Sequence, residues 1–296
     1  MRLKPGISLH YAEDALRNAV TVWGNARGAQ DYFRAFTDAV EKTSPMLECA
    51  FATPDLAAGL RSPAYWHLLQ LGSPTTVLAA SGFPLPSAPG HVQAEYAARN
   101  KALSAEIERQ QQLMQHAWTE LAALKELAQR PGLPVVYDTN MLNHWAQPGD
   151  LRWREILKSE GVETKLVRLI IPLKVIDELD RQKYGDGALA KKAATAIRYL
   201  ERTLGDTAPG TPVDLRPGEA TLEVWNDSDH RDADPDLAIL RCATDIAALH
   251  PDAQVRVLTD DTGMRLRAHH LGLTPLRLPA DQRKKGTAMD VPAEQP

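Results

Sequence analysis

The second half of the chain alternates short β-rich runs with helical runs, and this alternation constrains the fold more than any other feature. The β-rich runs carry few charges and are LPVVYD (133–138), LVRLIIP (166–172), ATLEVW (220–225), VRVLT (255–259) and TPLRL (274–278). Helical patterns separate them, near 151–160, 173–183, 188–204, 236–249 and 263–271. Such alternation is typical of a parallel sheet covered by helices on both faces. We therefore predict a compact α/β domain over 131–279, built on a five-stranded parallel sheet flanked by helices.

The first 130 residues have a different, wholly helical pattern. Apolar spacing predicts helices over 11–23, 29–40 and 62–71, and then a long helix over 91–129. The long segment carries apolar or aromatic residues mostly three, four or seven positions apart: Tyr96, Leu103, Ile107, Met114, Trp118, Leu121 and Leu124. At 1.5 Å per residue this helix would be roughly 58 Å long. A helix of that length usually packs against a partner, in the same chain or in another.

Residues that favour loops and helix ends indicate the domain boundaries. Residues 72–90 are rich in Pro, Gly and Ser and predict a loop, while Arg130-Pro131-Gly132 ends the long helix. Residues 280–296 show no periodicity. We expect an all-α accessory domain over 1–130, the α/β domain over 131–279 and a flexible tail over 280–296.

Charge and cysteine content exclude several classes of protein. The chain has 34 Lys and Arg against 38 Asp and Glu, a net charge of −4, so it is not a broadly basic nucleic-acid coat. Residues 1–130 carry 12 charges of each sign, which places the whole acidic excess in the second half. Two cysteines cannot form a disulfide framework or a four-cysteine zinc site. With no signal-peptide core and no apolar run of membrane-spanning length, we expect a cytoplasmic protein.

Four separate segments of the second half carry carboxylates, either directly after a predicted strand or in the helix that follows one. Asp138 ends the first strand, and Thr259-Asp260-Asp261 follows the fourth. Asp236, the last residue of the acidic segment NDSDHRDADPD (226–236), opens a helix. The helix after the second strand contains Glu178, between Asp177 and Asp180. Ligands of parallel α/β sheets bind beyond the carboxyl ends of the strands, so these acids are expected to meet at one sheet edge.

An acidic edge of this kind indicates a cation site. Each carboxylate raises its neighbours' pKa, and a cation offsets that repulsion. Hard oxygen ligands without cysteine or paired histidine favour Mg²⁺ or Mn²⁺, and such ions promote phosphodiester hydrolysis by activating water. Taken singly, each acid also fits an ordinary helix cap, turn or solvent-facing position.

Four segments, in this order, resemble the PIN domain family of metal-dependent nucleases. They are YDTN (137–140), VIDELDRQK (175–183), DLAIL (236–240) and LTDDTGMRLRA (258–268), and the resemblance covers about 133–279. The residues around VIDELD and LTDD resemble the eukaryotic-type and PhoH-associated branches of the family more than the short toxin branch. The resemblance implies a sheet in the order 3-2-1-4-5, and an acidic pocket holding one or two divalent ions. It also implies endonucleolytic cleavage of single-stranded RNA that leaves a 5′-phosphate and a 3′-hydroxyl.

The resemblance carries roles onto individual positions. Asp138 would be the central metal ligand, followed by Glu178, Asp236 and Asp261 as the second, third and fourth acids. Asp260, next to the fourth acid, is a further candidate metal ligand. The supporting residues that would orient carboxylates or substrate are Asn140 and Thr259. Many relatives have a second acid directly after the third, where this chain has Leu237, and that departure bears on a second metal ion.

A phosphate backbone also needs basic side chains near the acidic pocket. The candidate substrate-binding residues are Arg181, Lys183, Lys191, Arg198 and Arg265. Tyr184, His144 and Trp145 lie in nearby segments but are more often packing residues, so no role is assigned to them. The neutral helical region before residue 131 favours contact with a protein, either a second copy of the chain or a different partner.

Three other functions compete with the nuclease. A PIN-like module could bind RNA or protein without cutting, although retention of four acids argues against it. A haloacid-dehalogenase-like phosphatase needs an aspartate two residues after Asp138, where this chain has Asn140. A phosphoacceptor receiver domain places its paired acids after the first strand, which is not the order here.

Overall fold

The structure is a computed structural model that describes residues 2–52, 54–71, 90–225 and 234–284. It divides into two compact units, Met1–Lys125 and Glu126–Pro296. The predicted loop over 72–90 lies outside the described residues except for its last position, as do 226–233 of the acidic segment and 285–296 of the expected tail. None of the described helices is both long enough and apolar enough to span a membrane.

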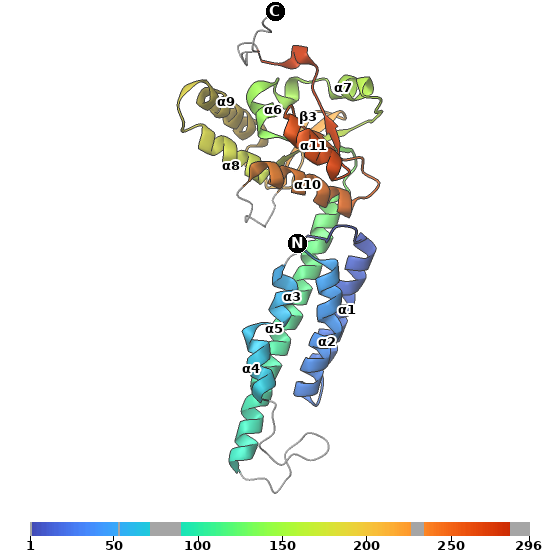
Figure 1. Cartoon of the computed structure of the whole chain (residues 1–296), viewed down its shortest axis with the longest axis vertical. Helices are drawn as coiled ribbons and strands as arrows, with labels where there is room; N and C mark the ends of the chain where they lie inside the picture. The colour runs from blue at the N-terminus through green and yellow to red at the C-terminus, as the bar shows by residue number, and fades with distance from the viewer. Residues whose placement is uncertain (1, 53, 72–89, 226–233, 285–296) are drawn as a thin grey trace, which may run out of the picture. The chain divides into compact units, whose positions relative to one another are not determined.

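The first unit is all-helical, as predicted. It contains α1 (Leu9–Arg27), α2 (Tyr32–Ala50), α3 (Pro54–Leu60), α4 (Pro63–Leu71) and most of α5 (Gly90–Ala128). Helices α1 and α2 lie side by side (Figure 1). Helix α2 continues ten residues beyond the predicted end at residue 40 and accommodates Pro45, because its later turns still bury apolar residues such as Leu47.

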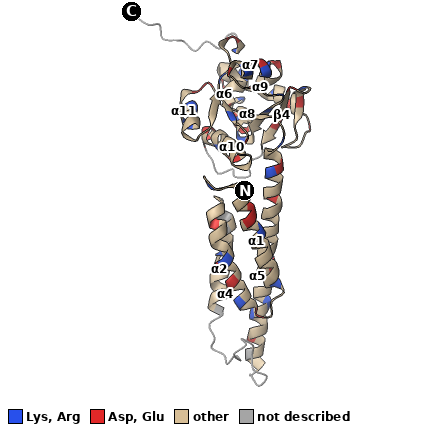
Figure 2. Cartoon of the chain, turned by 90° about the vertical axis from the view of Figure 1, so that its right-hand side faces the viewer, with Lys and Arg blue, Asp and Glu red and all other residues tan. Residues whose placement is uncertain are grey.

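The long helix α5 packs against its own chain. Leu103, Ile107 and Met114 on one side of it are completely buried. The Gln110 amide donates to the carbonyl oxygen of Gly59 in α3 over 2.9 Å, and Lys125 pairs with Glu13 of α1 at 2.7 Å. Basic and acidic residues are interspersed along the helices of this unit (Figure 2). The apolar stripe read from the sequence is therefore largely used within the unit.

The second unit is built on a six-stranded mixed sheet. Its strands are β1 (Leu133–Tyr137), β2 (Val167–Pro172), β3 (Val213–Arg216), β4 (Ala220–Trp225), β5 (Arg256–Leu258) and β6 (Thr274–Leu276). Their order is β3-β4-β2-β1-β5-β6, and all neighbours are parallel except β3 and β4. The five predicted strands thus have the expected 3-2-1-4-5 order. The prediction of a five-stranded, wholly parallel sheet is wrong by one edge strand.

The extra strand β3 forms a hairpin with β4. Gly218, with φ of +70°, allows the tight turn between them. Its short sequence, VDLR, carries two charges and is only partly buried, as is common for an edge strand. Because of this composition, the strand could not be predicted from apolar runs in the sequence.

Helices surround the sheet (Figure 1). They are α6 (Thr139–His144), α7 (Trp153–Ser159), α8 (Leu173–Gln182), α9 (Gly187–Leu204), α10 (Pro235–Leu249) and α11 (Thr262–His270). The helices predicted after residue 150 are confirmed, whereas the short helix α6 was not predicted. Strands β2 and β4 are buried along their whole length, so the core lies on both faces of the sheet.

One ion pair lies inside this core. Arg168 of β2 and Glu223 of β4 are 2% and 1% exposed, and the Arg168 Nε–H donates to a Glu223 oxygen over 2.9 Å. Arg168 also donates to the carbonyl oxygens of Leu127 and Ala128, at the C-terminal end of α5. Arg130 contacts the second Glu223 oxygen at 3.1 Å. These bonds satisfy helix-end carbonyls that have no partner within the helix.

Candidate metal centre

Asp138 lies where β1 ends, and its side chain is only 2% exposed. The Thr259 hydroxyl donates to one carboxylate oxygen over 2.6 Å, and the backbone N–H of Asn140 donates to the other over 3.3 Å. These bonds lower the pKa of Asp138, but burial outweighs them, and the charges of Asp236 and Glu178 raise the pKa further, to about 6. A buried, anionic carboxylate at this position therefore depends on a compensating positive charge.

Glu178 comes from α8, the helix that follows β2. One of its carboxylate oxygens accepts from the Thr139 hydroxyl over 2.5 Å, and the other accepts from the Gln182 amide over 3.0 Å. Gln182 in turn accepts from the Asn143 side chain over 2.9 Å. Thr139, Asn143 and Gln182 were not singled out from the sequence. Their signal was the placement of Thr139 directly after Asp138 and of Gln182 one helical turn after Glu178.

Asp261 follows β5 and begins α11. Its carboxylate accepts from the backbone N–H of Met264 over 2.7 Å, as an N-cap residue does. Its own N–H donates to the Thr259 hydroxyl oxygen over 3.1 Å. Because that hydroxyl donates to Asp138, Thr259 links the acids after β1 and β5.

Asp236 lies in the first turn of α10. Asp234 is the N-cap of this helix and accepts from the Asp236 N–H over 3.0 Å, which gives the upstream acid a structural role. The Asp236 carboxylate pairs with Arg267 of α11 at 3.2 Å. Burial, Asp234 and Asp261 raise the pKa of Asp236, while Arg267 lowers it. Leu237 is 41% exposed and supplies no oxygen ligand.

Asp260 has two arginine neighbours. Its carboxylate contacts Arg277 at 3.3 Å, and its carbonyl oxygen accepts from Arg265 over 3.2 Å. Asp260 and Asp261 both line a cleft of about 620 Å³. Arg265 thus lies beside the acids, where its second guanidinium nitrogen donates to Thr262.

The donor set fits a hard divalent cation by its chemistry. Four segments bring carboxylate oxygens to the carboxyl edge of β1, β2 and β5, where the positive ends of α10 and α11 also favour negative charge. Oxygen-only ligands are those that Mg²⁺ and Mn²⁺ prefer. Within the described residues, no three His, Cys, Asp or Glu side chains form a ready-made metal site. An ion held by Asp138 together with Asp236 would have to compete with Arg267 for Asp236.

The other predicted basic residues lie away from the acids' immediate contacts. Lys183 pairs with Asp180 and lies 4.9 Å from the Tyr184 ring centroid. The side chains of Arg181, Lys191 and Arg198 are exposed. None of the five predicted substrate-binding residues is among those that line the described cleft.

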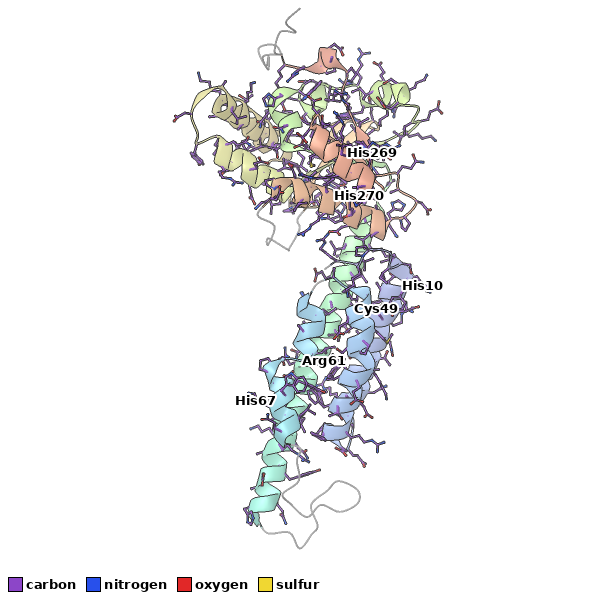
Figure 3. The ribbon with its side chains drawn as sticks, viewed as in Figure 1. His10, Cys49, Arg61, His67, His269 and His270 are labelled. Carbon is purple, nitrogen blue, oxygen red and sulfur yellow. The ribbon has the colours of Figure 1, made fainter. Side chains whose placement is uncertain are left out.

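A cleft of about 620 Å³ adjoins the acids. It is lined by Asn140, His144, Trp145, Leu189, Asp260, Asp261, Thr262 and Arg283. His269 and His270 lie at the opposite, C-terminal end of α11 and do not line it (Figure 3). Sequence reasoning missed the part played by Leu189 and Arg283, because these residues come from separate segments and belong to no motif.

The comparison with protein families decides the identity of this unit. The family model described as "PIN domain" matches residues 135–277, which include every acid described above. These residues form a PIN domain. PIN domains are generally metal-dependent nucleases, and the resemblance drawn from four short segments is confirmed. A comparison of the chain with curated proteins found no match. The helical unit before the PIN domain lies outside the family match.

Proposed function

We propose that the chain is a divalent-metal-dependent endoribonuclease that hydrolyses phosphodiester bonds of single-stranded RNA and leaves a 5′-phosphate and a 3′-hydroxyl. The observation that carries this proposal is the burial of Asp138 among Glu178, Asp236 and the Thr259-linked Asp261. A protein that keeps mutually repelling acids at a sheet edge gains from them only when a cation is present.

In this proposal Asp138, Glu178, Asp236 and Asp261 hold Mg²⁺ or Mn²⁺, with Asp260 as a further candidate ligand. When bound, the ion supplies a water nucleophile at neutral pH and stabilises negative charge on the phosphate. Thr259 and Thr139 fix the carboxylates of Asp138 and Glu178 through their hydroxyl groups. Asn140 lines the cleft beside Asp261, where its amide can donate to a substrate oxygen. The basic residues Arg181, Lys183, Lys191, Arg198 and Arg265 remain candidates for longer-range contacts with the strand.

The proposal is tested by cleavage of a labelled single-stranded RNA by the full-length chain in Mn²⁺, Mg²⁺ or EDTA. Cleavage is expected with either metal and not with EDTA, and the products are expected to carry a 5′-phosphate. Asp138→Asn should reduce the rate by at least two orders of magnitude, because it removes the central charge while keeping the side-chain volume. Asp177→Asn is the matched control, since Asp177 is an exposed acid next to Glu178. Equal rates for wild type and Asp138→Asn would refute the assignment.

A binding module that does not cut RNA is the second candidate. Two observations favour it: Leu237 takes the position of a second acid, and Arg267 already neutralises Asp236. Such a module would bind the labelled RNA without cutting it under any metal condition. The cleavage assay, run beside a binding assay on the same strand, therefore separates the two functions.

A further inference from the structure

The cleft beside the acids is lined by side chains of opposite charge. Asp260 and Asp261 supply carboxylates, while Arg283 supplies a guanidinium and His144 an imidazole. Lys192 of α9 adds a second cation, because its ammonium nitrogen lies 3.4 Å from Nδ1 of His144. A ligand that fills the cleft therefore meets both carboxylates and cations.

Arg283 belongs to a segment that follows the family match. Residues 280–284 begin with the short 3₁₀ helix η2 (Ala280–Gln282) and lie against the end of α6. The N–H of Ala146 donates to the carbonyl of Gln282 over 2.8 Å, and the N–H of Lys284 donates to that of His144 over 3.0 Å. The Lys284 ammonium donates to the carbonyl of Leu142 over 2.8 Å. These bonds hold Arg283 at the cleft.

Several cationic side chains lie close to His144. Burial lowers the pKa of His144 most, the charges of Lys192, Arg283 and Lys284 lower it further, and Asp260 raises it. In the described part of the chain, neither Lys192 nor Arg283 forms an ion pair with a carboxylate. The buried Nε of Arg283 has no hydrogen-bond partner among the described residues. Nearby like charges with unused donors favour an anionic ligand.

We propose that His144, Lys192 and Arg283 form a subsite for a backbone phosphate of the RNA, next to the linkage that is cut. This inference rests on the proposed function, which places the cleaved linkage at the metal-binding acids, of which Asp260 and Asp261 line the cleft. A single strand can meet both groups of side chains, because one phosphate would be bound at the acids with the metal ion and a neighbouring phosphate would reach the cations. The cleft volume of about 620 Å³ lies within the roughly 300–1,000 Å³ range of ligand sites.

Two further side chains that line the cleft bear on how an RNA strand would lie in it. Leu189, 44% exposed on α9, offers an apolar contact to a base or ribose. Trp145 is only 5% exposed, and the Arg283 guanidinium lies 5.8 Å from its ring centroid. Trp145 therefore supports Arg283 rather than stacking on a base.

The test measures binding separately from cutting. A fluorescent single-stranded RNA is bound to the full-length chain carrying Asp138→Asn, and the anisotropy is followed at several salt concentrations. Adding Lys192→Gln or Arg283→Gln should weaken binding several-fold and reduce the slope of log Kd against log salt by about 0.7, the value for one phosphate contact on a single strand. Lys165→Gln is the control, since this exposed lysine lies at the amino end of β2, away from the carboxyl edge, and should change neither quantity.

A second measurement locates the phosphate. Each linkage of the RNA is replaced in turn by a neutral methylphosphonate, and the Kd is measured again. Replacing one linkage near the cut should weaken binding to the parent Asp138→Asn protein, but not to the protein that also carries Arg283→Gln. Lys192→Gln, on a separate helix, should lose sensitivity at the same linkage even if Arg283→Gln loosens residues 280–284. Cleft variants that bind every strand as the Lys165→Gln control does would overturn the subsite.

The two proposals fail in different ways. If the wild type cuts RNA with metal but the cleft variants bind like the control, the subsite is wrong and the nuclease stands. If the wild type never cuts but the cleft variants lose affinity and linkage sensitivity, the phosphate site stands and the nuclease is wrong.

Discussion

At the scale of single residues, Asp138 combines a local structural role with an electrostatic cost. It accepts the N–H of Asn140 as the N-cap of α6, so the ordinary helix-cap interpretation of this residue holds. It is also buried beside other acids, which a cap alone does not require. Asp261 also has two roles, although it is exposed: it caps α11, and it is linked to Asp138 through Thr259. These positions are therefore suited to folding and to cation binding at once.

The raised pKa of Asp138 predicts how the metal-free protein responds to pH. The folded protein holds a proton on Asp138 up to about pH 6, whereas the unfolded chain releases it near 3.8, so folding stability falls as the pH rises between these values. Asp138→Asn removes this loss and should be more stable than the wild type at pH 7 in EDTA, by about 2 to 3 kcal/mol. At pH 4 the two proteins should have similar stability. Urea unfolding at both pH values measures the difference, and an Asn variant less stable at pH 7 would contradict this account of Asp138.

Thr259 is predicted to act by positioning Asp138. Thr259→Val keeps the shape of the side chain but removes the hydroxyl that bonds Asp138 and Asp261. Loss of such a supporting bond typically costs about 10–100-fold in metal affinity or activity. Thr259→Ser retains the hydroxyl and should recover most of the loss. Metal titrations of the two variants decide the matter, and equal affinity for Val and Ser would show that the hydroxyl has no such role.

At the scale of elements, the buried pair of Arg168 and Glu223 joins β2, β4 and the last residues of α5. Each partner is nearly inaccessible, and the remaining hydrogen-bonding groups of Arg168 are used by backbone carbonyls. Removing Arg168 would leave the buried Glu223 with only the partly exposed Arg130, at 3.1 Å, as a counter-charge. The pair is therefore expected to matter more for folding than the exposed ion pairs of α1.

Arg168→Met should lower the free energy of unfolding of the PIN domain by about 3–5 kcal/mol, the usual cost of breaking a buried ion pair. The double variant with Glu223→Leu should recover much of that loss, because it removes the stranded charge as well. Denaturant unfolding of the single and double variants gives the coupling. A double variant as unstable as the sum of two single losses would count against this explanation.

The elements differ in how well sequence predicts them. The five parallel strands are apolar and bounded by clear turns, so they could be predicted from the sequence pattern, while their order was implied by the family resemblance. β3 could not, because an edge strand with two charges lacks the apolar signal. The six residues of α6 are too few to show a helical period, and its N-cap, Asp138, was interpreted mainly as a site residue. The acids lie after regular elements and could be picked out, whereas Arg283 at the cleft depends on a tertiary contact that no local pattern records.

At the scale of the whole molecule, the family match accounts for the PIN domain and leaves the helical unit without an assigned role. That unit buries its own core around Trp23, whose ring packs edge-on against Phe36 at 6.0 Å. It also exposes Trp66 by 56% and Tyr11 by 39%. We propose that this unit contacts a protein, either a second copy of the chain or a different partner, as its neutral charge favours.

Truncation tests the boundary of the PIN domain and this role together. A fragment of residues 126–296 keeps Arg130 and the carbonyls that bind Arg168, whereas a fragment of 131–296 loses them. The longer fragment should therefore unfold at a higher temperature. Light scattering of the full chain and of the longer fragment then tests self-association: an oligomer of the full chain that the fragment also forms would rule out a role for the helical unit in it.

The central claim is that acids from separate segments of the PIN domain bind one divalent cation around Asp138. Titration of Mn²⁺ into the full-length protein, with free Mn²⁺ followed by electron paramagnetic resonance, tests it most directly. The account predicts at least one saturable site in the wild type and in Asp177→Asn, and its loss in Asp138→Asn. Equal Mn²⁺ binding by all three proteins, or no binding by the folded wild type, would contradict the claim.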